Sequence, residues 1–244
     1  MEVHHHPKVP HEKNKHLKEY FLEFLMIFLA VTMGFIAESI REHSTDSSKE
    51  KEYIEGMIKD LKVDTANIKF IISQGNEQLR GLDTLKNISR EKLSDLKVQD
   101  SLYKYSTHYL FGLNPFKSED ITLIQLRNAG GYRLIRKGGA VDSIARYESK
   151  LDIVSLQQTF LSQGITKAVD AANLIFNFNA YAKMRLHPGA TEVLVTTDKE
   201  KINSFYNQCW MMSVMVTNYN SILKNHLEYS TTLIAYLKKT YNME

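Results

Sequence analysis

YFLEFLMIFLAVTMGFIA, residues 20–37, contains one charged residue, Glu23, in eighteen positions. A helix rises about 1.5 Å per residue, so this run is just long enough to cross the hydrocarbon core of a bilayer. It therefore predicts a transmembrane helix at residues 20–40. That helix follows a short tail at residues 1–19 and precedes a larger region at residues 44–244.

Two other interpretations fit an apolar segment near an N-terminus. A cleaved signal peptide has a shorter apolar core, about 7–15 residues, and a small-x-small cleavage site. Here the run continues into Glu38, Ser39 and Ile40 without such a site. A buried helix of a soluble protein is the second alternative, but its sequence usually carries a polar residue every three or four positions. An uncleaved membrane anchor is the interpretation that we adopt.

The residues on either side of the span predict its orientation. Four basic residues precede the span, namely Lys8, Lys13, Lys15 and Lys18. The basic residues that follow it are diluted by acidic ones. Basic flanks stay in the cytoplasm, so residues 44–244 are expected on the far side of the membrane. In a bacterium this predicts an inner-membrane protein with one span, a cytoplasmic N-terminus and a periplasmic C-terminal domain.

Four residues of the span lie along one stripe of a helix. Glu23, Ala30, Gly34 and Ala37 follow one another at intervals of seven, four and three. Ala30 and Gly34 form a small-xxx-small pair, which lets two helix backbones approach closely in lipid. The stripe predicts a helix-packing interface, with a second copy or another membrane subunit, that buries Glu23. The alternative is that Glu23 extends to the cytoplasmic interface.

The region after the span reads as helical almost throughout. Its 26 lysines and arginines against 22 aspartates and glutamates give a net charge of +4, too small and too scattered to indicate nucleic-acid binding. Apolar residues recur at intervals of three and four along most of it. Helices are expected at residues 47–90, 91–109, 120–128, 140–183 and from about 197 to the C-terminus. The fold class is therefore all-α, with one N-terminal transmembrane helix followed by an elongated antiparallel helical bundle.

Local signals set the limits of these helices. Ser47-x-x-Glu50 is a potential cap for the first bundle helix, unless the membrane helix continues directly into it. Thr197-x-x-Glu200 reads as a capping box that opens the last helix. Residues 192–196, EVLVT, are the one strand-like segment, and they have no evident strand to pair with.

The chain lacks the common sequence signatures of catalysis. There is no glycine-rich phosphate loop, H-E-x-x-H, C-x-x-C or G-x-S-x-G motif, so we expect no enzyme activity and no cofactor. Cys209 occupies a core position of the last helix and reads as a small buried hydrophobic residue. His226, on the same stripe, reads as a hydrogen-bonded core histidine rather than a metal ligand.

The N-terminal histidines form a separate candidate site. His4, His5 and His6 precede Pro7, and imidazole is a good ligand for zinc, copper or nickel. A metal site is one interpretation. A basic tail without fixed structure and an ordered contact with a partner are the other two.

Three segments carry a resemblance to a known family. They are HHHPKV, then LKEYFLEFLMIFLAVTMGFIAESIREH with EKEYIEGMIKDLKVD, and later ITLIQLRNAGGYRLIR. The chain resembles an uncharacterised family of single-pass membrane proteins common in Bacteroidota. The family's T-x-x-x-L-x-x-x-G-x-x-x-L-I pattern is carried here by Thr122, Leu126, Gly130, Leu134 and Ile135, and Tyr147 follows it. The resemblance implies a single-pass inner-membrane protein and brings no activity or site residue.

Two functions from different classes remain. The first is a non-catalytic scaffold or accessory subunit that contacts membrane lipid and assembles, as a homo-oligomer or within a larger membrane complex, through its transmembrane helix. The second is a periplasmic helical bundle that binds a ligand and signals through a partner. Six aromatic residues are candidates to line such a pocket, although core packing is their more ordinary role. They are Phe176, Phe178, Tyr181, Phe205, Tyr206 and Trp210.

Overall fold

The computed structural model describes residues 13–128, 130–180 and 192–243, and most of these are helical, with no extended strand among them. The predicted all-α class is confirmed. The chain divides into two compact units, Met1–Glu52 and Tyr53–Glu244. Each unit is described below by itself.

The described part of the first unit, residues 13–52, is the beginning of α1, which runs from Lys13 to Lys86 as one helix. No helix start occurs at Ser47, so of the two alternatives given above the predicted membrane helix continues directly into the first bundle helix. One 18-residue window of α1 has a mean hydropathy of 2.1, and none of that window is buried within the protein. Its large apolar side chains are exposed, including Phe24, Ile27 and Phe35. By length and composition, this part of α1 is able to cross a membrane.

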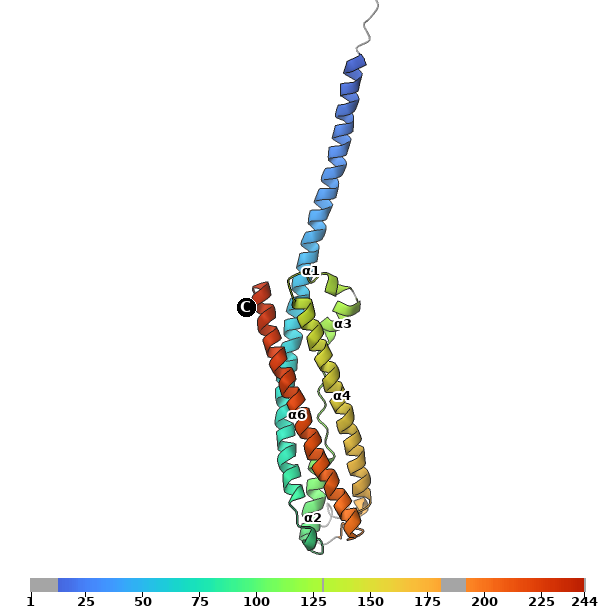
Figure 1. The fold of residues 1–244 in the computed structure, drawn as a ribbon, viewed down its shortest axis with the longest axis vertical. Helices are drawn as coiled ribbons and strands as arrows, with labels where there is room; N and C mark the ends of the chain where they lie inside the picture. Colours follow the sequence, from blue (N-terminus) through green and yellow to red (C-terminus); the bar gives the residue numbers. More distant parts are fainter. Residues whose placement is uncertain (1–12, 129, 181–191, 244) are drawn as a thin grey trace, which may run out of the picture. The chain divides into compact units, whose positions relative to one another are not determined.

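The second unit is an antiparallel bundle in which α1, α4 (Ala140–Asn173) and α6 (Lys199–Tyr241) are the long helices (Figure 1). Hydrogen bonds from α6 to α1 establish their opposite directions. The Tyr206 hydroxyl donates to the Ile88 carbonyl just beyond the end of α1, whereas Asn220, further along α6, bonds to Asn76. The N-terminal part of α4 lies beside the C-terminal part of α6.

The fourth part of the bundle consists of several short helices and a non-helical segment, seen in green in Figure 1. The short 3-10 turn η1 (Arg90–Lys92) leads into α2 (Leu96–Tyr105), which continues as the π-helical turn η2 (Ser106–Leu110). Residues 111–120 form no helix or strand, and we call this segment the strap. This part ends in α3 (Ile121–Asn128) and the turn η3 (Gly131–Arg133).

Several of the expected helix limits differ from the structure; the helix expected at residues 47–90, for example, ends at Lys86. The helix expected at residues 91–109 begins at Leu96 because the Asp95 carboxylate accepts a hydrogen bond from Lys97 N, 2.8 Å, and caps the helix there. The helix expected at residues 140–183 begins as predicted but ends at Asn173. The backbone then turns so that Phe176 forms an isolated antiparallel bridge with Leu194. Residues 192–196, which had no evident partner in the sequence, therefore pair with residues just after α4.

The cap of the last helix is one residue later than the capping box suggested. Asp198, not Thr197, is the N-cap of α6, and its carboxylate accepts a hydrogen bond from Lys201 N at 3.0 Å. Asp satisfies the free amides of a first turn as well as Thr does, and its charge also interacts favourably with the helix dipole.

The core of the bundle consists of two hydrophobic clusters. One contains Leu61, Leu126 and Leu233, near the beginning of α4 and the end of α6. The other contains Ile68, Val154 and Leu223, in the half that holds α2. Along α1 and α6, the residues between the two clusters include polar ones, Asp64 on α1 and His226 on α6, and both are buried. A buried polar layer thus lies between two apolar cores.

Candidate functional site

The strap is held in the bundle by side chains that bond to its backbone. A segment outside helices and strands lacks their regular backbone hydrogen bonds, and a buried amide or carbonyl without a partner is costly. Gln78 on α1 donates to the carbonyl of Gly112 in the strap at 3.0 Å and to that of Tyr109, in the adjoining η2, at 2.9 Å. Gln158 on α4 donates to the Phe116 carbonyl at 3.1 Å. Each of these bonds substitutes for one that a continuous helix would have made within itself.

Tyr219 on α6 bonds to the centre of the strap. Its hydroxyl accepts a hydrogen bond from Phe116 N at 2.9 Å and lies 3.4 Å from the Asn114 carbonyl, to which it donates. Both Phe116 and Tyr219 are buried. Burial raises the pKa of the Tyr219 hydroxyl. The neutral hydroxyl, which donates and accepts at once, is the form that this contact requires.

Two aspartates of α1 bond to backbone amides where the strap meets α3. The Asp64 carboxylate accepts from Glu119 N at 2.7 Å, and the Asp60 carboxylate accepts from Thr122 N at 3.0 Å. Asp60 and Asp64 are one helical turn apart, so they present their carboxylates on the same side of α1. The N-terminus of α3 is thereby capped from a neighbouring helix, which satisfies two amides and places negative charge at the positive end of the helix dipole.

Asp64 also receives a hydrogen bond from α4, because the Tyr147 hydroxyl donates to its second carboxylate oxygen. Asp64 is fully buried. Burial raises the pKa of Asp64 to about 6, although the bonds from Tyr147 and from Glu119 N act in the opposite direction. Burial, followed by the nearby Asp64 charge, raises the pKa of Tyr147, which therefore stays protonated. Asp64 consequently gains or loses its proton in the mildly acidic range.

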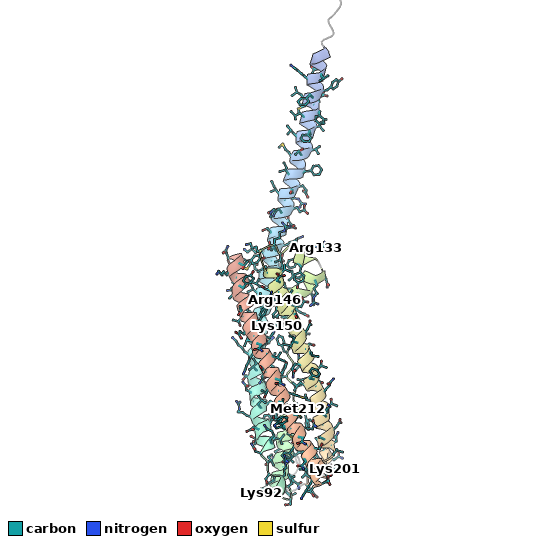
Figure 2. The ribbon with its side chains drawn as sticks, in the orientation of Figure 1. Lys92, Arg133, Arg146, Lys150, Lys201 and Met212 are labelled. Carbon is teal, nitrogen blue, oxygen red and sulfur yellow. The ribbon has the colours of Figure 1, made fainter. Side chains whose placement is uncertain are left out.

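His226 on α6 lies on the other side of Tyr147. The two rings are stacked with their centroids 4.9 Å apart, and the Phe116 ring of the strap meets His226 edge-on at 5.9 Å. The side chain is 1% exposed, and neither ring nitrogen has a hydrogen-bond partner among the described residues. Burial, and secondly the charge of Lys150, lower the pKa of His226 to about 4. Lys150 is labelled on α4 in Figure 2.

The prediction for His226 was therefore right about burial and wrong about hydrogen bonding. The ring stacks on Tyr147 and meets Phe116 edge-on, and both of its nitrogens are buried without a hydrogen-bond partner among the described residues. Among the described residues, no three or more His, Cys, Asp or Glu side chains are grouped in a way that would hold a metal ion. The chemistry that this arrangement supports is proton uptake and release at two buried groups.

The predicted interface stripe lies on the exposed surface of α1. Glu23, Ala30, Gly34 and Ala37 are all exposed, and a Cβ added at Gly34 would meet nothing within 4 Å. Their spacing on a continuous helix places them on one stripe, as the sequence indicated. Whether this stripe is an interface stays a prediction. His4, His5 and His6, the candidate metal ligands, lie outside the described residues.

The remaining candidates have ordinary structural positions. Cys209 is fully buried, and burial raises the pKa of its thiol to about 12, so the interpretation as a core residue is confirmed. Phe176 and Phe205 are buried and pack edge-to-face, with centroids 5.4 Å apart. Tyr206 is buried beside them, Phe178 is partly exposed and Trp210 is 57% exposed, while Tyr181 lies outside the described residues. Core packing is thus the role of Phe176, Phe205 and Tyr206.

The sequence contained a signal for Asp64 that the sequence reasoning did not use. Asp64 stands three residues after Leu61 and four before Ile68, so it lies on the apolar stripe of its helix. A charged residue in such a position requires a partner inside the fold. No comparable pattern marks Gln78, Gln158 or Tyr219, because their partner is the backbone of a distant segment.

Comparison with known protein families, with curated proteins and with solved structures found no match to this chain.

Proposed function

We propose that this chain is a non-catalytic, membrane-anchored scaffold or accessory subunit, whose transmembrane helix assembles with other membrane helices and whose bundle lies in the periplasm. The observation that carries this proposal is that no residue in the most apolar window of α1 is buried within the protein. An apolar helix of this kind is stable when lipid or other helices surround it.

A second exposed apolar surface, on the bundle, supports the same function. Ile153, Leu156 and Phe160 of α4 are 51%, 56% and 47% exposed, and their spacing of three and four places them on one side of the helix. Exposed apolar side chains gathered on one helix side are typical of protein contact surfaces. A scaffold requires such surfaces outside the membrane, whereas an isolated anchored domain does not.

The first test is the composition of the native complex. The chain is extracted in a mild detergent, its mass is measured by native mass spectrometry, and every co-purifying chain is identified. A defined complex, either a homo-oligomer or one with other membrane proteins, is the expected result. A monomer that co-purifies with no other chain would refute the proposal.

The stripe on α1 is tested by adding bulk to it. Gly34→Leu fills the small-xxx-small position, so the complex should dissociate or lose most of its partner. Ile36→Phe is the matched control, because it adds bulk to a different side of the same helix turn and should leave the complex intact. Equal behaviour of the two variants would remove the stripe from the interface.

The orientation is tested separately with a reporter at the C-terminus. A reporter enzyme that is active only in an oxidising compartment is expected to be active, and a reporter that matures only in the cytoplasm is expected to be silent. The reverse pattern would place the bundle in the cytoplasm and leave the scaffold proposal in place with a different location.

A ligand-sensing bundle that signals through a partner is the second candidate function. The observation that favours it is that one helix, α1, carries both the candidate span and the aspartates that hold the strap. A ligand-dependent change in strap protection from hydrogen exchange would support this candidate over the scaffold.

A further inference from the structure

One end of the bundle carries a concentration of basic residues. Residues 121–141 and 231–243 contain six basic residues and no acidic residue. These six are Arg127, Arg133, Arg136, Lys137, Lys238 and Lys239. At the opposite end, Lys92 and Lys201 each stand directly after a glutamate in the sequence (Figure 2). The positive charge of the bundle is therefore not spread evenly over it, and we call the end formed by these two segments the basic end.

Contacts within the bundle bring the two segments together where α1 begins its part of the bundle. The Lys137 ammonium lies 4.7 Å from the centroid of the Tyr241 ring, which joins the loop before α4 to the end of α6. A Cβ added at Gly131 would lie 3.1 Å from the Tyr53 ring, so the same loop adjoins the first residue of the second unit. Figure 2 shows Arg133 at this end. The basic end is thus the end from which α1 leads towards the candidate span.

The basic end presents much of its charge to solvent. Four of its basic residues are exposed, namely Arg133, Arg136, Lys137 and Lys239. Arg127 forms an ion pair with Glu148 of α4, so it adds little net charge. Asp142 on α4 and Glu55 on α1 are acidic residues at the same end, and they are fewer than the exposed basic ones. The basic end therefore keeps a net positive charge.

We propose that the basic end binds the anionic phospholipid surface of the membrane that holds α1. This inference rests on the membrane anchor of the proposed function, and it adds an electrostatic contact between the bundle and the lipid headgroups. Each Lys or Arg near an anionic membrane surface strengthens binding roughly 5-fold. The phosphate groups of the bilayer are the anions that a continuous α1 brings closest to this end.

The length of α1 determines how the contact forms. Residues 40–53, between the predicted span and the bundle, are helical and extend about 20 Å. An upright α1 holds the basic end further from the lipid than the screening length of about 8 Å at physiological salt. Membrane helices tilt by up to about 40°, and a tilt lowers one side of the bundle towards the headgroups. Binding therefore requires α1 to tilt on an anionic membrane.

A fluorescent probe on the full chain in lipid nanodiscs tests the contact. Gly138→Cys provides the labelling site at the basic end, where an added Cβ would meet nothing within 4 Å. Cys209 is buried, and the wild-type chain taken through the same labelling gives the background. Neutral nanodiscs consist of phosphatidylcholine, and anionic ones also contain phosphatidylglycerol. Both contain a lipid with a nitroxide on its headgroup, which quenches only a probe close to the membrane surface.

The probe at position 138 should be quenched strongly in anionic nanodiscs and weakly in neutral ones. The difference should disappear at 1 M salt, where the screening length is about 3 Å. A probe introduced by Ser94→Cys, in the exposed turn before α2, should respond to neither lipid. Equal quenching at position 138 in both nanodiscs would overturn the inference while leaving the membrane anchor in place. A chain that enters neither kind of nanodisc would overturn the anchor itself, and this inference with it.

Removing charge from the basic end should abolish the response. The combined variant Arg133→Gln, Arg136→Gln and Lys239→Gln should lower the ratio of bound to unbound bundle roughly 100-fold, and the probe in anionic nanodiscs should then behave as in neutral ones. Arg133→Gln alone, which covers the case in which the combined variant does not fold, should lower that ratio roughly 5-fold.

A matched control removes the same charge from the opposite end of the bundle. Lys92, Lys97 and Lys201 are exposed there, and their combined replacement by Gln changes the net charge of the chain equally. This variant should keep the wild-type quenching in anionic nanodiscs. If both combined variants lost the quenching to the same extent, overall charge and not the basic end would govern the response, which would contradict the inference.

Discussion

Removing the Tyr219 hydroxyl is the sharpest perturbation of the strap, since this one atom accepts the Phe116 amide at 2.9 Å. Tyr219→Phe keeps the ring and its packing but leaves a buried N–H without an acceptor. An unsatisfied buried donor costs about 1–3 kcal/mol, so we expect the free energy of unfolding to fall by about 2 kcal/mol. For a domain of this size that corresponds to a decrease of about 4–8 °C in Tm.

A matched control exists on the same helix. The Tyr229 hydroxyl donates to the Ser143 carbonyl, also at 2.9 Å, and it is only partly buried. Ser143 lies inside α4, where its carbonyl has an intrahelical partner as well. Tyr229→Phe should therefore lower the stability by only about 0.5 kcal/mol.

The assay is thermal unfolding of the full chain in detergent, followed by far-ultraviolet circular dichroism. Hydrogen exchange of the strap amides, measured on the same samples, should be faster in Tyr219→Phe than in the wild type. It should be unchanged in Tyr229→Phe. Equal decreases in Tm for the two variants would refute the role assigned to this hydroxyl. Unchanged hydrogen exchange of the strap amides in Tyr219→Phe would refute it as well.

Two further predictions concern packing in the half of the bundle that contains α2. A Cβ at Gly81 would overlap the base of the Tyr109 ring, which rotation of that ring does not relieve, so Gly81→Ala should cost about 1–2 kcal/mol in denaturant unfolding. Gly138→Ala, with nothing within 4 Å of the added carbon, should stay within about 1 kcal/mol of the wild type, and similar losses in both would contradict this packing. Burial raises the pKa of Cys209 to about 12, so a maleimide at pH 7.5 should modify it only after denaturation, as seen in the intact mass. Rapid labelling of the folded chain would show that the thiol is accessible.

Periodicity alone was sufficient for much of the fold. The spacing of Ile54, Ile58, Leu61 and Ile68 identified the buried side of α1, and all four are buried. Helix limits were less predictable, because they depend on which of several polar residues caps the helix. Asp95 and Asp198 act as caps where a sequence reading favoured earlier positions.

The sequence by itself determined three properties: an apolar run with one charged residue near the N-terminus, a helical remainder, and apolar stripes that meet in a core. Each depends only on residues that are close together in the chain, so each can be predicted from the sequence alone. Only the tertiary structure decided where residues 111–120 lie. Side chains of Gln78, Gln158 and Tyr219, on three different helices far apart in the sequence, bond to their backbone. The same distance explains Asp64 and His226, whose burial beneath one segment, and hence whose shifted pKa values, arise only when α1, α4, α6 and the strap come together.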